Sequence, residues 1–158
     1  EVLFRDAESH LRLDAMPRRD LISIFERDAK LALDKLEPTM LALPVSSYNQ
    51  DHTAVFRAAF TAARPGVPGI KSFQPIVLGY DNTSLFWSLE REKFHPHFYV
   101  DITDFLDRKL KALSMYESQM RDAIHHSSVQ NVEFTARMRG REISREAAEG
   151  YMVFRHVL

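Results

Sequence analysis

The chain has 158 residues, of which 45% are hydrophobic and 27% charged, with a formal net charge of −1. This composition is that of one ordinary globular domain, and the near-zero charge gives no electrostatic footprint for nucleic acid or an anionic membrane surface. No apolar run approaches the roughly 18 residues of a membrane span. Because the chain has no cysteine, a metal site would have to use His, Asp or Glu. The absence of cysteine also fits a reducing compartment, and we expect a cytoplasmic protein.

Short apolar runs alternate along the chain with stretches of helical spacing. In chain order they predict a strand at residues 2–4, a helix over 21–36, a strand at 40–45, a helix over 51–63, strands at 75–78 and 98–100, helices over 104–120 and 129–138, and a strand at 151–157. The first predicted helix starts ahead of its apolar positions, with Pro17 in its first turn, and Pro38 ends it; Thr103 is a suitable cap for the third helix.

The alternation of strands and helices indicates crossover connections, and therefore an α/β fold with a mainly parallel sheet flanked by helices. We expect a single domain over residues 1–158, since no linker, repeat or low-complexity tract divides the chain. Ligands of such sheets lie at the carboxyl ends of the strands. The loop over residues 46–52 follows a predicted strand and enters a helix, so it is expected at the functional edge.

Within this loop, the run Asn49-Gln50-Asp51-His52 places short polar groups beside an imidazole. One interpretation is that His52 ligates a metal, with Asp51 oriented beside it. The alternative is that Asp51 or Asn49 only caps the following helix and that His52 is a solvated residue of its first turn. Spacing alone favours the capping alternative.

Other polar clusters have weaker patterns. The segment His95-Pro96-His97 places two imidazoles on one face of a strand, but its proline indicates an edge or entry position. The pair His125-His126 lies in a polar loop, where exposed histidines are commonly only solvated. Arg137, Arg139 and Arg141 can form a clamp for an anion or a sugar hydroxyl, or can be solvated cations at the end of a helix.

Six short motifs follow one another in a characteristic order. They are Leu11-Arg12-Leu13-Asp14, Ser47-Tyr48-Asn49-Gln50-Asp51-His52, Tyr99-Val100-Asp101-Ile102, Tyr116-Glu117-Ser118-Gln119, Ala136-Arg137-Met138-Arg139-Gly140 and Glu149-Gly150-Tyr151. No single motif is specific, but the ordered set resembles the LmbE/PIG-L family of N-acetylglucosaminyl deacetylases over nearly the whole chain.

The resemblance implies a Rossmann-like sheet, a Zn²⁺ cofactor and hydrolysis of the N-acetyl, or another small N-acyl, amide of an amino-sugar conjugate. It implies that His52 is a zinc ligand with the acidic Asp51 beside it. Asn49 stands where many members have a histidine that polarises the acyl oxygen, and His125 corresponds to a loop histidine that we expect to protonate the leaving amine. Arg139 is the residue expected to contact the substrate.

One departure from the family pattern concerns the metal. The family's A-H-P-D-D-E motif, which supplies two further zinc ligands and an Asp base, does not occur in this sequence. We therefore expect the chain to be the C-terminal two-thirds of such a domain, without its first strands, and to be inactive alone because catalytic zinc needs about three protein ligands. The alternative is a non-catalytic fragment or a degenerate carbohydrate-binding module on the same fold. We also expect a homo-oligomer.

Overall fold

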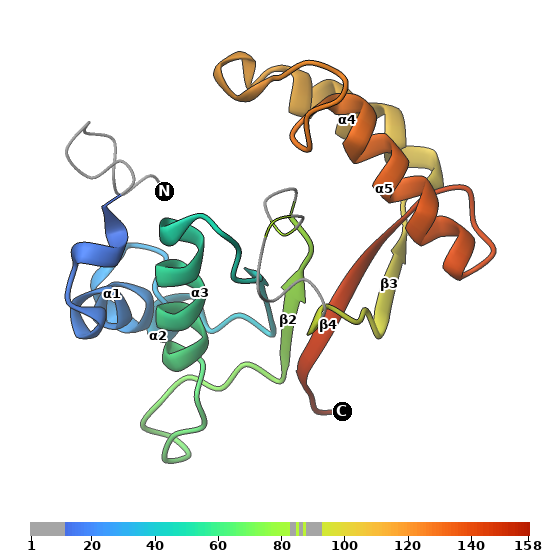
Figure 1. Ribbon diagram of the computed structural model, residues 1–158. Helices are drawn as coiled ribbons and strands as arrows, with labels where there is room; N and C mark the ends of the chain where they lie inside the picture. Colours follow the sequence, from blue (N-terminus) through green and yellow to red (C-terminus); the bar gives the residue numbers. More distant parts are fainter. Residues whose placement is uncertain (1–11, 83–84, 86, 88–92) are drawn as a thin grey trace.

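The computed structural model describes residues 12–82, 85, 87 and 93–158 of the chain (Figure 1). The strand predicted at residues 2–4 lies outside the described residues, as does the start of the first motif. No described helix is long and apolar enough to cross a membrane.

Four strands form one sheet in the described part of the chain. They are β1 (Met40–Pro44), β2 (Ile76–Tyr80), β3 (Phe98–Asp101) and β4 (Ala148–His156), in the order β1-β2-β4-β3. The first two strands are parallel, whereas β4 is antiparallel to both β2 and β3. The predicted α/β class is confirmed. The sheet is mixed, however, because β4 returns between two strands that share the opposite direction.

The predicted helix over residues 21–36 is wrong as a single element. It is broken into α1 (Arg18–Ser23), the π-helical turn η2 (Ile24–Asp28) and α2 (Leu33–Leu36), preceded by the short turn η1 (Leu13–Ala15). The chain becomes extended at Ala29, and Glu37 ends α2 in the left-handed region at φ 46°. The break therefore falls after η2, within which the buried carboxylate of Glu26 binds Arg64 and Lys71.

Of the remaining helices, the one predicted over 51–63 is confirmed within one residue, the one predicted over 104–120 is divided and its main helix ends at Ser114, and the one predicted over 129–138 continues to Glu142. They are α3 (Gln50–Ala62), η5 (Thr103–Phe105), α4 (Leu106–Ser114), η6 (Glu117–Gln119) and α5 (Val129–Glu142). Thr103 does not cap a helix with its side chain. Its backbone N–H and its hydroxyl both donate to Asp101 Oδ1, at 3.0 and 2.7 Å, which fixes the turn between β3 and η5.

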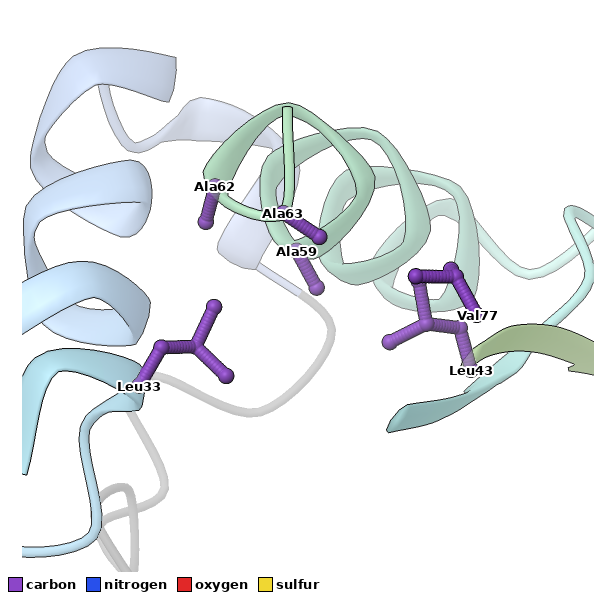
Figure 2. Close-up of a cluster of buried hydrophobic side chains, with 6 residues drawn as sticks. All are labelled: Leu33, Leu43, Ala59, Ala62, Ala63 and Val77. Atoms are coloured by element: carbon purple, nitrogen blue, oxygen red, sulfur yellow. The ribbon is translucent and has the colours of Figure 1, made fainter. Parts of the chain in front are cut away.

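Two hydrophobic clusters hold helices against different parts of the sheet. In the first, three alanines of the α3 region allow the helix to approach β1 and β2 closely (Figure 2); its buried members are Leu33, Leu43, Ala59, Ala62, Ala63 and Val77. The second joins α4 and α5 to the start of β4, through Ile102, Leu106, Ala136 and Ala147. Figure 1 shows the consequence, with α3 beside β1 and β2 and the pair α4–α5 beside β3 and β4.

Candidate functional site

The loop between β1 and α3 is held by its own side chains. Asn49 is the N-cap of α3, and its Oδ1 accepts hydrogen bonds from the backbone N–H groups of Asp51 at 2.9 Å and His52 at 3.4 Å. The capping alternative is therefore confirmed for Asn49. Because the amide oxygen is used by the helix, its NH₂ group is the end of the side chain available for donating to another group.

His52 is half-buried rather than solvated, and its ring is fixed from one side. Its Nδ1 lies 2.9 Å from the hydroxyl of Ser47, a buried residue whose Oγ also accepts from the Asn49 backbone N–H at 3.3 Å. With Nδ1 engaged in this way, Nε2 is the ring nitrogen left for a ligand. Burial lowers the pKa of His52, and the nearby Asp51 charge opposes that shift only in part. The ring is therefore neutral near pH 7, which is the form that binds metals.

Asp51 makes a structural contact that its sequence position did not suggest. Its Oδ1 accepts a hydrogen bond of 2.9 Å from the backbone N–H of Leu13, in η1. The carboxylate next to His52 thereby ties the start of α3 to the N-terminal turn. Because Oδ1 accepts this hydrogen bond, Oδ2 is the carboxylate oxygen of Asp51 that is better placed for a direct role in chemistry.

A second loop, distant in sequence, reaches the first. The ring nitrogen Nε2 of His126 lies 3.2 Å from the hydroxyl of Tyr48, and the two rings meet edge to face at 5.9 Å. His125 stacks on His126 at 4.1 Å, and its Nδ1 accepts the backbone N–H of Ser127 at 3.1 Å. The structure thus brings the His125-His126 pair to the loop that carries His52. Neither Ser47 nor Tyr48 was predicted to contribute to the site, and their contacts with His52 and His126 have no local signal in the sequence.

Two of the other candidate segments, His95–His97 and Arg137, lie away from the His52 loop in contacts of their own. The segment from His95 to His97 leads into β3, where the His97 backbone N–H donates to Tyr151 O at 2.8 Å. Arg137 binds Glu133 and Glu146 at the surface, as expected of a cation at a helix end.

Arg139 behaves differently from its neighbour, because only 15% of its side chain is exposed. Its guanidinium binds Asp81 at 3.3 Å and Glu142 at 2.8 Å, and it lies 5.4 Å from the centre of the Phe94 ring. Asp81 directly follows β2, so the rule that placed residues 46–52 at the carboxyl ends of the strands would also have found Asp81.

A cleft of about 820 Å³ opens between α4–α5 and the strands β2 and β4. Arg139, Asp81, Lys109 and Glu149 supply the charged groups of its wall, and much of the remainder is apolar or aromatic. This volume is in the range of roughly 300–1,000 Å³ typical of sites for small organic ligands.

The described residues do not by themselves fit a zinc ion. No group of three or more His, Asp or Glu side chains converges within residues 12–82, 85, 87 and 93–158 in a way that could hold a metal. His52 offers one imidazole, whereas a catalytic zinc is held by about three protein ligands. A zinc centre at this loop would need groups from outside the described residues.

Comparison with known proteins gives the fold a context. No family model matches the chain, and no curated protein matches its sequence. Among solved structures, the conserved protein TT1542 from Thermus thermophilus superposes with a TM-score of 0.68 and 22% identity, over 98% of this chain and 64% of that chain. The N,N'-diacetylchitobiose deacetylase from Pyrococcus horikoshii superposes with a TM-score of 0.59 and 21% identity, over 96% of this chain and 55% of that chain.

These similarities define a class of fold. The chain has the α/β architecture that a diacetylchitobiose deacetylase also has, and it spans less than two-thirds of the length of either solved chain. At 21% and 22% identity, the likeness extends to the fold and does not by itself transfer an activity.

Proposed function

We propose that the chain belongs to a zinc-dependent hydrolase of the LmbE/PIG-L kind, which removes the N-acetyl or another small N-acyl group from an amino-sugar conjugate. The observation that carries the proposal is the His52 loop, placed at the carboxyl end of β1 in a fold shared with a diacetylchitobiose deacetylase. The activity is proposed for the intact protein. Residues 1–158 alone are expected to be inactive, because the described part supplies one imidazole toward the metal.

In this proposal the residues of the loop have distinct tasks. His52 is one zinc ligand, and it would bind through Nε2 because Ser47 holds Nδ1. Asn49 would donate from its amide NH₂ to the acyl oxygen, since its Oδ1 caps α3. Asp51 holds the loop against η1 and shapes the field around His52.

The acid that protonates the leaving amine is proposed to be His125. Its neighbour His126 is the residue that touches Tyr48, but burial and the adjacent His125 lower the pKa of His126. A neutral imidazole is a poor proton donor and a good acceptor, so His126 suits a hydrogen bond from the Tyr48 hydroxyl. Arg139 is proposed as a substrate contact on the wall of the cleft.

A carbohydrate-binding module without catalysis is the second candidate. The observation that favours it is the cleft, which is present in a chain whose described residues contain no metal cluster. We further propose a cytoplasmic homo-oligomer; the absence of cysteine supports the compartment.

Acetate release from N,N'-diacetylchitobiose and zinc content, both measured on the intact protein, test the proposal. We expect His52→Ala to lower both, whereas the control His97→Ala, in the segment before β3, should change neither. No acetate release by the zinc-loaded intact protein, together with retained binding of the disaccharide, would instead support the binding module.

A further inference from the structure

We propose that the cleft between α4–α5 and strands β2 and β4 binds the neutral, hydroxyl-bearing part of a glycoside, the part that does not react. The inference deepens the proposed function by naming the class of group attached to the amino sugar. It rests on that function only for the claim that the bound group belongs to a deacetylase substrate.

The first argument is the charge balance of the wall. Arg139 is paired with Asp81 at 3.3 Å, and Lys109 Nζ is paired with Glu149 Oε1 at 2.6 Å. Among the described residues, the charged groups that line the cleft are therefore two cations and two anions. The charge of an ionised ligand would find its opposite charges on such a wall already paired, whereas a neutral ligand needs no opposite charge.

The second argument is that the same pairs offer both donors and acceptors to a ligand. The Tyr151 hydroxyl donates to Glu149 Oε2 at 2.5 Å, which extends the Lys109–Glu149 pair along β4. Arg139 Nε is buried and makes no hydrogen bond to another described residue. A small rotation of the guanidinium toward an oxygen in the cleft would satisfy this donor. Sugar hydroxyls, which donate and accept, fit a wall of this kind.

The third argument is the apolar part of the wall. Phe94 and Leu113 line the cleft, together with the aromatic rings of Tyr80 and Tyr151. The carbon–hydrogen faces of pyranose rings pack on such surfaces, while their hydroxyls reach the ion pairs. A small inorganic anion would leave these apolar groups without contacts.

The geometry of β4 helps to form this wall. A Cβ at Gly150 would lie 3.0 Å from Pro96 Cβ and 3.3 Å from Arg139 Cδ. Glycine at this position therefore lets the Arg139 side chain lie against the strand, where the guanidinium faces Asp81.

The wall of the cleft is joined to the His52 loop by one direct hydrogen bond and, through His126, by a second. Asn82, on the cleft wall, donates from Nδ2 to Val45 O at 3.0 Å, at the start of the loop that leads to His52. Asn131, also on the wall, donates from Nδ2 to His126 O at 2.8 Å, and His126 contacts Tyr48. The proposal therefore places the acyl group of the substrate at the loop and the remainder of the substrate in the neighbouring cleft.

Calorimetric titration tests the proposal with cellobiose, a neutral disaccharide without an acyl group, and with cellobiuronic acid, its charged counterpart. We expect cellobiose to bind and cellobiuronic acid to bind at least roughly tenfold more weakly, since both cations on the described part of the wall, Lys109 and Arg139, are already paired with carboxylates. Leu113→Trp fills the cleft from α4 and should weaken cellobiose binding at least tenfold, and Val132→Trp, which fills it from α5, should do the same. Lys111→Trp, on an exposed position of α4 outside the cleft, is the matched control and should bind as the unmodified chain does.

Circular dichroism of each variant shows whether it is folded, and the two filling variants lie on different helices. Unchanged cellobiose affinity in the folded filling variants, tighter binding of the acid, or no binding of either sugar would overturn the proposal. Because the probes carry no acyl group, cellobiose binding in the cleft without any deacetylation of N,N'-diacetylchitobiose would leave this inference standing and refute the proposed function. Deacetylation at an unchanged rate in both filling variants would leave the proposed function standing and refute this inference.

Discussion

The hydroxyl of Tyr48 lies 3.2 Å from Nε2 of His126, although 78 positions separate the two residues in the chain. This contact places the loop after β1 against the loop before α5, so that His125 and His126 belong to the same neighbourhood as His52. Two histidines in adjacent positions thereby acquire different environments, one facing Tyr48 and the other stacked behind it.

These environments predict different effects of removing each ring from the intact protein. We expect His125→Ala to lower kcat for deacetylation by roughly 10²–10⁴-fold and to remove the alkaline limb of the pH–rate profile, as loss of a general acid does. We expect His126→Ala to act mainly on KM, because it releases Tyr48 and loosens the loop. Steady-state kinetics from pH 5 to 9 separate the two outcomes, and loss of the alkaline limb in His126→Ala alone would assign the acid to His126.

The buried carboxylate of Glu26 predicts a pH-dependent stability. Burial raises the pKa of Glu26, but hydrogen bonds and charge from Lys71 and Arg64 outweigh it, so the pKa lies below the ordinary value of 4.5. A carboxyl group with a lowered pKa stabilises the fold above its unfolded pKa and loses that contribution as the pH falls through the folded pKa. We expect Glu26→Gln to cost about 2 kcal/mol at pH 7, allowing for the exposure of Arg64.

Thermal unfolding of Glu26→Gln and the unmodified chain, measured between pH 7 and pH 3, checks this. The difference between the two should shrink toward low pH. The control Glu117→Gln, at an exposed position without an ion pair of this kind among the described residues, should show little difference at any pH. An equal cost of Glu26→Gln at pH 7 and pH 3 would contradict the assigned role.

The close approach of α5 to β4 predicts a steric cost at Gly140. A Cβ there would lie 2.7 Å from backbone atoms of Arg145 and Ala147, which cannot move aside as a flexible side chain can. We expect Gly140→Ala to lower the free energy of unfolding by about 1–3 kcal/mol, although alanine favours helices. Urea unfolding measures the change, with Arg141→Ala on the exposed side of the same helix as the control. A stabilised Gly140→Ala variant would show that the helix can shift away from β4.

The local elements could be predicted from the sequence more closely than their arrangement. The strand at 40–45 and the helix at 51–63 were predicted within one or two residues, because apolar runs and helical spacing are local signals. The break after η2 was missed, because the apolar spacing continues past Ala29, where the chain becomes extended. The direction of β4 depends on where the chain returns after α4 and α5, which spacing along the chain does not encode.

The candidate site shows the same division. The loop 46–52 was predicted at the edge of the sheet from its position after a strand, and the structure places it there. Its partner could not be predicted, since nothing local to Tyr48 indicates a contact with His126. The roles of His52, Asp51, Asn49, His125 and Arg139 in catalysis and binding stay predictions, to be decided by the experiments above.

The outer strand of the described sheet predicts self-association. Within the described residues β1 is an edge strand, and a strand edge presents unpaired backbone groups that can pair with another chain. Its outward face is also apolar, with Met40 47% exposed and Ala42 exposed beside it. A lysine on such an edge opposes pairing, because each new contact would bury or juxtapose charge. We therefore expect Met40→Lys to shift the 158-residue chain toward monomer in sedimentation velocity, with the dissociation constant of self-association raised at least roughly tenfold. The control is Val67→Lys, at an exposed position outside the sheet, which should leave association unchanged. A chain that is monomeric at high concentration without any substitution would show that the β1 edge is protected, and equal effects of both lysines would show that association depends on net charge rather than on this strand.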